Sequence, residues 1–316
     1  MEKRTLGNTG IPVSRLCFGT LTLGPLQRNL SPEAGGEIIA AAIARGVNFF
    51  DTAELYETYP HIREGLRRAG WPGNIVISSK TYAYTRALAV AAVEGARAAL
   101  DRDVIDIFML HEQESVHTLR GHREALDYLY ECKAKGIVRA VGASMHHVAA
   151  VRGAIHFGLD VIHPLLNIDG LGIVDGTRED MEAAVSEAHA KGMGVFAMKA
   201  LGGGNLIPRA EECLRYALGL DFSDAVAIGC QSVDEIDANI GFFETGRFTE
   251  PQKTALAQTR RTLHIDDWCI GCGACAAFCP QSALRIEKSR AVCDPAKCVL
   301  CGYCAAKCES WAIKVV

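Results

Sequence analysis

Four polar side chains follow three apolar runs of the chain, and their chemistry is complementary. Asp51 ends the first run and Tyr56 lies in the loop after it, while Lys80 and His111 directly follow the second and third runs. A phenol has a pKa of about 10 and is a poor acid at neutral pH. A neighbouring ammonium stabilises the phenolate and lowers that pKa. We therefore expect Lys80 to lower the pKa of Tyr56, and Asp51 to hold Lys80 charged and in place.

If His111 donates a hydrogen bond to a substrate carbonyl, the four groups together would polarise that carbonyl and protonate its oxygen. This predicts reduction of a carbonyl, or oxidation of an alcohol in reverse, with Tyr56 as general acid/base. Each residue also has a structural interpretation, since Asp51 could cap a helix and Lys80 and His111 could be solvated loop residues. Because all four follow successive runs, the catalytic interpretation is the stronger one.

A second group of reactive residues is concentrated near the C-terminus. Of the 13 cysteines, nine lie in the last 48 residues. Eight of these form two runs of C-x₂-C-x₂-C-x₃-C, at 269–279 and 298–308. Because the N-terminal residues lack the apolar region of a signal peptide, we expect this crowding to reflect a metal or cluster module rather than disulfides. Zinc is a weaker alternative because its sites close at four ligands. Cys293 lies outside both runs and is interpreted as a structural thiol.

The two cysteine runs are copies of one repeat. Each copy is followed by a short alternating segment, at 283–286 and at 312–315, which predicts two pseudo-symmetric halves that each contain a small strand. A segment this small cannot hold a large core, so the clusters could serve only to staple it. A second cluster is superfluous in a staple and useful in a relay, so we favour electron transfer.

The first 250 residues or so alternate between strand-like and helix-like segments. Continuous apolar runs indicate strands that are buried on both faces, and eight strand–helix pairs in about 250 residues are the size of a (β/α)₈ barrel. An open doubly wound sheet is the alternative, but no Gly-x-Gly-x-x-Gly turn follows the first strand. The expected strands are 13–20, 47–51, 75–80, 104–111, 137–144, 160–164, 194–198 and 224–229. In a parallel barrel their C-terminal ends meet on the face that carries the chemistry.

Charge and hydropathy limit the classes of partner. The chain has 316 residues and a net charge of −4, which argues against a nucleic-acid or anionic-membrane partner. Its N-terminus lacks the apolar core of a signal peptide, and no apolar run is long enough to span a bilayer. We therefore expect a soluble, cytoplasmic protein that has neither nucleic acid nor membrane as a partner.

From residue 3 to about residue 243 the chain resembles the aldo-keto reductase family. The resemblance is carried by the segments RTLGNTG (4–10), CFGT (17–20), GIVRAVGAS (136–144) and LGGG (201–204). It implies an α/β fold, a TIM barrel that binds NAD(P)(H) without a Rossmann motif and acts on a small-molecule carbonyl or alcohol. The catalytic tetrad of the family maps onto Asp51, Tyr56, Lys80 and His111.

The C-terminal segment resembles bacterial-type two-cluster ferredoxins, in which the fourth cysteine of each run ligates the other cluster. The resemblance implies a barrel over 1–258 and a small α+β ferredoxin-like domain over 259–316, with an external electron-transfer protein as partner. It implies two 4Fe–4S clusters. One would be held by Cys269, Cys272, Cys275 and Cys308, and the other by Cys298, Cys301, Cys304 and Cys279.

The resemblance to the reductases also implies a nucleotide pocket, in which this chain departs from the usual residues. Ser144 would hold the nicotinamide carboxamide, His163 stands where Gln is usual, and Met198 stands where an aromatic ring usually stacks. Phosphate would bind at the loops after the seventh and eighth strands. Glu235 stands where an Arg often grips a 2′-phosphate, which favours NAD over NADP. The candidate nucleotide-binding residues are Ser144, His163, Met198, Leu201, Gly203, Gly229, Ser232, Glu235 and Asn239.

Three hypotheses about function follow. The first is a nicotinamide-dependent oxidoreductase that exchanges electrons through its clusters, although hydride carries two electrons and each cluster carries one. The second is an iron–sulfur redox protein whose barrel no longer binds nicotinamide and uses the clusters or another cofactor. The third is a non-enzymatic electron carrier or scaffold with a vestigial barrel, which the intact tetrad disfavours.

Overall fold

Eight parallel strands close into a barrel in a computed structural model that describes residues 1–315. The strands follow the order β10-β3-β4-β5-β6-β7-β8-β9 around the barrel, which confirms the predicted barrel over the open sheet. All six side chains of β5 and of β6 are buried, because helices cover the outside while side chains fill the interior. The barrel strands are β3 (Leu16–Gly19), β4 (Phe49–Asp51), β5 (Val76–Thr81), β6 (Ile105–Leu110), β7 (Val138–Met145), β8 (Val161–Pro164), β9 (Gly194–Ala197) and β10 (Ala225–Gly229).

Helices cover the barrel from outside. The first begins after Ser31, whose Oγ accepts a hydrogen bond from the backbone N–H of Ala34 (3.3 Å), and Pro32 occupies its first turn, where no N–H is needed. No helix within residues 1–315 is long and apolar enough to cross a membrane. The helices up to the end of the barrel are α1 (Pro32–Ala44), α2 (Tyr59–Arg68), α3 (Arg86–Leu100), α4 (Val116–Gly121), α5 (Arg123–Ala134), α6 (Val148–Phe157), α7 (Arg178–Ala190), α8 (Ala210–Leu218), α9 (Val233–Thr245) and α10 (Glu250–Gln258).

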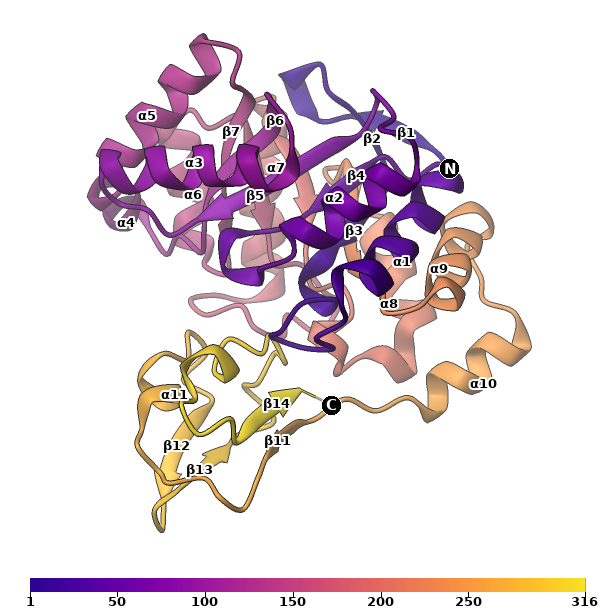
Figure 1. Ribbon diagram of the computed structural model, residues 1–316, viewed down its shortest axis with the longest axis vertical. Coiled ribbons are helices and arrows are strands. Elements are labelled where there is room, and N and C mark those ends of the chain that lie inside the picture. Colours follow the sequence, from indigo (N-terminus) through magenta and orange to yellow (C-terminus); the bar gives the residue numbers. More distant parts are fainter. Residues whose placement is uncertain (316) are drawn as a thin grey trace.

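The first predicted strand, 13–20, is divided between two sheets. Its beginning belongs to β2 (Pro12–Ser14), which pairs antiparallel with β1 (Lys3–Thr5), and only its second part enters the barrel as β3. Arg15 lies between the two parts. The last residue of β2, Ser14, is anchored because its N–H donates to Asn48 Oδ1 (2.6 Å) and its Oγ donates to the carbonyl of Leu16 (2.7 Å). Val13 of the hairpin packs against side chains in the interior of the barrel. The hairpin lies at the end of the barrel opposite the C-terminal module (Figure 1).

The C-terminal module consists of two similar halves, as the repeat predicted. One half pairs β12 (Leu284–Glu287) with β13 (Arg290–Cys293), and the other pairs β11 (Leu263–Ile265) with β14 (Ile313–Val315). The short helix α11 (Ala274–Ala277) of the first copy corresponds to a 3-10 turn at Ala305–Lys307 in the second. The module, drawn in yellow, lies beyond one end of the barrel (Figure 1).

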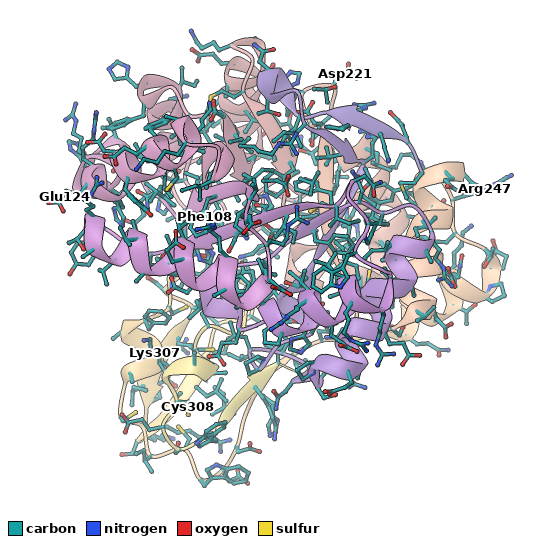
Figure 2. The ribbon with its side chains drawn as sticks, turned by 45° about the horizontal axis from the view of Figure 1, so that its top comes forward. Phe108, Glu124, Asp221, Arg247, Lys307 and Cys308 are labelled. Atoms are coloured by element: carbon teal, nitrogen blue, oxygen red, sulfur yellow. The ribbon has the colours of Figure 1, made fainter. Side chains whose placement is uncertain are left out.

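Labelled residues show how the two parts are separated. Phe108 of β6 lies within the body of the barrel, and Lys307 and Cys308 lie in the module (Figure 2). Asp221, in the turn after α8, lies on the far side of the barrel from Cys308 (Figure 2). The module therefore faces only one end of the barrel, the end where the candidate catalytic residues lie.

Close backbone contacts join the module to the barrel. Gly203, in the loop after β9, has φ +70°, and a Cβ there would collide with the carbonyl oxygen of Val299. Gly302 has φ +78°, and a Cβ there would collide with the carbonyl oxygen of Leu26. Asn205 Nδ2 donates to the carbonyl of Cys298 (2.8 Å). Positions 203 and 302 require glycine, because the backbone there is left-handed and because the backbones of the barrel and the module approach each other closely.

Candidate active site and cluster-binding region

A buried ion pair forms the base of the candidate site. The Lys80 ammonium donates to both carboxylate oxygens of Asp51 (2.7 Å each) and to the carbonyl of Thr52 (2.7 Å). Asp51 ends β4 and Lys80 lies near the end of neighbouring β5, so the parallel barrel brings them to the same rim. Burial lowers the pKa of Lys80, while the Asp51 carboxylate acts in the opposite direction. Because both charges are buried, each depends on the other for compensation.

Tyr56 lies beside this pair, but the expected lowering of its pKa is wrong. Burial and then the Asp51 charge raise the pKa of Tyr56 well above its usual value, while the hydrogen bond between Tyr56 and Tyr303 acts in the opposite direction. The physical reason is that the N–H groups of the Lys80 ammonium donate to Asp51 and to the Thr52 carbonyl. Its Nζ lies 5.0 Å from the centre of the Tyr56 ring and forms no hydrogen bond with the hydroxyl. The phenol is therefore protonated, but Lys80 does not make it the stronger acid that the sequence predicted.

His111 completes the group that the sequence predicted. Its Nε2 lies 3.4 Å from the Tyr56 hydroxyl, and the Tyr82 ring stacks on the imidazole with centroids 4.5 Å apart. Burial and then the Lys80 charge lower the pKa of His111 well below its usual value, so the ring is neutral. Within the described residues Nδ1 has no hydrogen-bond partner. The arrangement favours the tautomer that carries its proton on Nε2 and donates it toward the site.

A third phenol enters the site from the C-terminal module. The Tyr303 hydroxyl lies 3.2 Å from the Tyr56 hydroxyl and 3.2 Å from His111 Nε2. Tyr303 is only 3% exposed and packs with Leu26 and Ala53 of the barrel. Tyr303 was not among the site residues predicted from the sequence. A signal was present in the repeat, because the position of Tyr303 in the second copy is held by Ala274 in the first.

A cavity of about 390 Å³ extends from Asp51 and Tyr56 toward α9 and is bounded on one side by the module. It brings together most of the predicted nucleotide-binding residues with one predicted cluster ligand, Cys301. The predicted residues that line it are Asp51, Tyr56, His163, Met198, Leu201, Gly203, Gly229, Glu235, Asn239 and Cys301. Lys199, Arg261 and Gln27 also line it and were not predicted.

Two of the predicted nucleotide-binding residues do not line this cavity, and neither do the predicted catalytic residues Lys80 and His111. The hydroxyls of the two nucleotide-binding residues accept hydrogen bonds from backbone N–H groups. Ser144 is fully buried, and its Oγ accepts a hydrogen bond from the N–H of Glu112 (2.9 Å). Ser232 caps α9, since its Oγ accepts from the N–H of Glu235 (3.2 Å). Glu235 in turn accepts from the N–H of Gln231 (2.8 Å). A carboxylate therefore already occupies the N-terminus of α9, where a phosphate would otherwise bind.

The residue at the usual Gln position is tied to the barrel. His163 stacks on Phe196 with centroids 3.9 Å apart and shares a hydrogen bond with the Phe196 carbonyl through Nδ1 (2.6 Å). Its Nε2 lies 3.7 Å from Asp51 Oδ2. Burial is the main cause that lowers the pKa of His163 to about 4, although the Asp51 charge opposes it. His163 is therefore neutral and links the base of the site to the cavity.

His146 is buried between the barrel and the C-terminal module, whereas the neighbouring His147 is partly exposed. His146 is 4% exposed, and its two ring nitrogens lie 3.1 Å from Lys199 Nζ and 3.2 Å from Gln281 Nε2. Gln281 belongs to the module, so His146 joins a cavity-lining lysine to it. No local sequence pattern indicates this burial, because the partner Gln281 lies 135 residues away.

The eight cysteines of the two runs fall into two groups in space. Burial raises the pKa of Cys275, and among charges the nearby Cys269, Cys272 and Cys308 raise it further. Burial also raises the pKa of Cys304. The charges of Cys301, Cys298 and Cys279 raise it further, and Cys275, from the other group, has the smallest effect. Each group combines three cysteines of one run with the fourth of the other. These are the two sets that the ferredoxin resemblance implies.

The surroundings of the sulfur atoms suit a cluster. A small cavity is lined by Cys269, Cys272, Cys275 and Cys308. The same N–H to sulfur hydrogen bond occurs in each half, from Ala283 to Cys279 (3.4 Å) and from Ala312 to Cys308 (3.2 Å). Such bonds stabilise thiolate ligands and tune cluster potential. In residues 1–315 no three His, Cys, Asp or Glu side chains converge tightly enough for a single ion.

Cys293 lies beside the second group although it belongs to neither run. Burial and then the neighbouring Cys298 raise the pKa of its thiol to about 12. Its position is consistent with the structural interpretation, but it is closer to the cluster region than the sequence suggested.

Two family models match the chain. One, described as the aldo/keto reductase family, matches residues 15–212, and the other, a 4Fe-4S dicluster domain, matches residues 268–312. The chain is 26% identical to the aldo-keto reductase YhdN of Bacillus subtilis, over 46% of this chain and 47% of that protein. It is 23% identical to L-galactose dehydrogenase of Arabidopsis thaliana, over 76% of this chain and 87% of that protein.

Solved structures show the same barrel. An aldo-keto reductase of Bacillus halodurans in its holo form superposes with a TM-score of 0.66 at 20% identity, covering 81% of this chain and 95% of that one. An aldo/keto reductase of Brucella melitensis gives a TM-score of 0.61 at 14% identity, covering 81% and 98%. At this identity the likeness establishes the fold alone.

Proposed function

The chain belongs to the aldo/keto reductase family and carries a 4Fe-4S dicluster domain, and on this premise we propose a specific oxidoreductase activity. It reduces a small carbonyl compound, or oxidises the corresponding alcohol, with NAD(P)(H), and this reaction is coupled to two 4Fe–4S clusters. Tyr56 is the general acid/base. The cluster domain occupies residues 259–316, after the barrel at 1–258.

The supporting chemistry of the barrel is proton transfer to an oxygen. Tyr56 is protonated and buried, and its hydroxyl lies within reach of neutral His111. An oxygen between these two groups would receive one hydrogen bond from the phenol and one from Nε2–H, which stabilises the charge that develops during reduction. The Lys80–Asp51 pair fixes the floor of the site. A bound nicotinamide would supply the hydride, and the clusters would carry single electrons.

One observation carries the coupling: Cys301 lines the same cavity as Asp51 and Tyr56. A ligand of the second cluster therefore borders the space in which substrate and nucleotide would meet. The other group of cysteines includes Cys272, which is exposed to solvent. This order, from an exposed group to a group at the cavity, is the order that exchange with an external electron-transfer protein requires. We place this exchange in the cytoplasm.

The cavity supports NAD better than NADP. Glu235 lines it with a carboxylate that already accepts from the N-terminus of α9. A carboxylate repels a 2′-phosphate and accepts hydrogen bonds from a ribose hydroxyl. Gly203 and Gly229 line the same region, and the space that a Cβ would take is filled by the Val299 carbonyl at Gly203 and by Thr22 at Gly229. Asn239 lies at the same end of the cavity as Glu235.

The second candidate is a barrel that has lost nicotinamide and uses its clusters or another cofactor. One observation favours it: Ser144, the expected partner of the carboxamide, is buried and bonded to Glu112 outside the cavity lining. His163 is likewise committed to Phe196. Because Ser144 and His163 already have hydrogen-bond partners within the barrel, neither is free to bind a nicotinamide carboxamide.

Titration of anaerobically prepared protein with NADH and with NADPH tests both candidates. Binding, followed by transfer of deuterium from position 4 of the nucleotide to the carbon of an aldehyde, supports the first. Absence of binding to either nucleotide, in protein whose cluster absorbance is intact, removes the first and leaves the second. The order of affinities separately tests the assignment of NAD over NADP.

A further inference from the structure

The oxygen position of the candidate site is filled by the chain itself. The Tyr303 hydroxyl lies 3.2 Å from the Tyr56 hydroxyl and 3.2 Å from His111 Nε2. Under the proposed function, these are the two atoms that a substrate oxygen must contact. All three residues are at least nine-tenths buried, and of the three only Tyr56 lines the large cavity.

We propose that Tyr303 occupies the position of the substrate in the resting protein, and that an incoming carbonyl binds by displacing its phenol. Tyr303 is thus a specificity-determining residue of the barrel that the module supplies. The inference rests on the proposed function, because it takes Tyr56 and His111 as the groups that receive the substrate oxygen.

The surroundings of the Tyr303 ring define the class of substrate. The ring packs with Leu26 and Ala53, and Leu21, Leu55 and Phe278 pack against the same cluster. A ligand that replaces the phenol should therefore present one carbonyl oxygen to Tyr56 and His111 and an apolar, ring-sized group to these side chains. Aryl aldehydes and ketones have this shape, and benzaldehyde is the simplest probe.

The attachment of Tyr303 explains how it can be both firmly placed and displaceable. It is held by the backbone contact of neighbouring Gly302 with Leu26 and by the hydrogen bond from Gln27 Nε2 to the carbonyl of Leu300 (3.2 Å). The phenol itself adds two hydrogen bonds between neutral groups, and such bonds contribute only modestly to stability. A ligand that remakes both of these hydrogen bonds recovers that contribution.

The test measures binding of benzaldehyde and of toluene by calorimetry, in cluster-loaded protein without nucleotide. Relative to the unmodified chain, Tyr303→Ala should bind benzaldehyde at least about tenfold more tightly, because the competing ring and its two hydrogen bonds are gone. Tyr303→Phe keeps the ring and removes only the hydroxyl, so its gain should be smaller, about three- to tenfold. Tyr84→Ala, at an exposed tyrosine, is the matched control and should show no gain.

A second comparison separates oxygen recognition from a simple cavity. In Tyr303→Ala, benzaldehyde should bind about fivefold or more tightly than toluene, and adding His111→Ala should abolish this preference. Equal benzaldehyde affinity in the unmodified chain, Tyr303→Phe and Tyr303→Ala would overturn the proposal, as would equal affinity for toluene and benzaldehyde. If Tyr303→Ala loses its cluster absorbance, Tyr303→Phe alone decides. Because no nucleotide is present, failure of the proposed NAD(P)(H) chemistry would leave this result unchanged.

Discussion

The hydroxyl of Tyr303 lies 3.2 Å from the hydroxyl of Tyr56, although the two residues belong to different domains. Tyr56 follows β4 of the barrel, and Tyr303 lies between two predicted cluster ligands, Cys301 and Cys304. The candidate catalytic phenol and the cluster region are therefore separated by a single side chain. The mouth of the barrel and the module therefore form a single candidate site.

Removing the Tyr56 hydroxyl should abolish carbonyl chemistry. Tyr56→Phe is expected to lower the turnover of an aldehyde by about 100- to 10,000-fold, because it removes the general acid. Cluster absorbance should remain, since Tyr56 contacts no sulfur through its hydroxyl. Tyr130→Phe, whose hydroxyl bonds the carbonyls of Phe157 and Gly158 away from the site, is the control. Steady-state kinetics measures both, and full activity in Tyr56→Phe would refute the assigned role.

Breaking the buried ion pair should destabilise the barrel. Asp51→Asn leaves the Lys80 ammonium buried without its partner and should lower the free energy of unfolding by about 3–5 kcal/mol. Asp169→Asn breaks the exposed pair with Arg209 and should cost less than about 1 kcal/mol. Urea denaturation of the two variants under identical cluster loading compares them. A similar loss in both would mean that the Lys80–Asp51 pair is not a buried pair in solution.

His163 should make the protein less stable as the pH falls. Its pKa in the folded protein is about 4, below the value of about 6.5 expected in the unfolded chain. Between these values the unfolded state binds more protons, so stability is lost as pH falls below about 6.5.

The loss through this one residue should be about 2 kcal/mol between pH 6.5 and 5.0. Denaturation curves of His163→Gln should lack that share of the pH dependence, whereas His117→Gln, at an exposed histidine, should keep it. Identical pH profiles for His163→Gln and the unmodified chain would show that His163 is free to protonate.

Nucleotide preference should depend on Glu235. Glu235→Gln removes the carboxylate at the start of α9 and should tighten NADPH binding by about tenfold while changing NADH binding little. Glu187→Gln, on the exposed side of α7, serves as control for the change of net charge. Fluorescence titration with both nucleotides measures the ratio. A parallel change for NADH and NADPH would place Glu235 away from the 2′-phosphate.

The cysteine groups should be separable by iron content. Replacing Cys269 by Ser should remove about half of the iron bound per chain, because it affects only one of two clusters. Replacing Cys298 should remove the other half. Cys293→Ser should keep all of the iron if Cys293 is only a structural thiol. Iron and sulfide analysis after anaerobic reconstitution distinguishes these cases, and a loss of iron in Cys293→Ser would make it a ligand.

The parts of the site that depend on strand order could be predicted from sequence. Asp51, Lys80 and His111 end or follow neighbouring strands, and parallel pairing then brings them to one rim. The pKa of Tyr56 could not be predicted in this way, because it depends on where the three donors of Lys80 point. The burial of Ser144 was equally hidden, since its partner Glu112 is fixed by the path of the next loop.

Contacts between the two domains were also beyond prediction from sequence. His146 and Tyr303 are buried by partners more than 100 residues away, and no local periodicity encodes such a pairing. The one available signal was the asymmetry of the repeat, where Ala274 and Tyr303 occupy equivalent positions. A bulky polar ring in only one of two copies indicates a contact that the repeat itself does not need.

The glycine contact at Gly302 has a consequence for how the protein matures. Gly302 and Tyr303 are enclosed by Cys301 and Cys304, so the loop that seats against Leu26 is the loop that iron would shape. We expect the newly made chain, before iron is inserted, to leave its barrel mouth uncovered. Assembly of the metal centre would then also be the step that closes the mouth, and iron starvation would yield a barrel with altered substrate access as well as one without electron transfer.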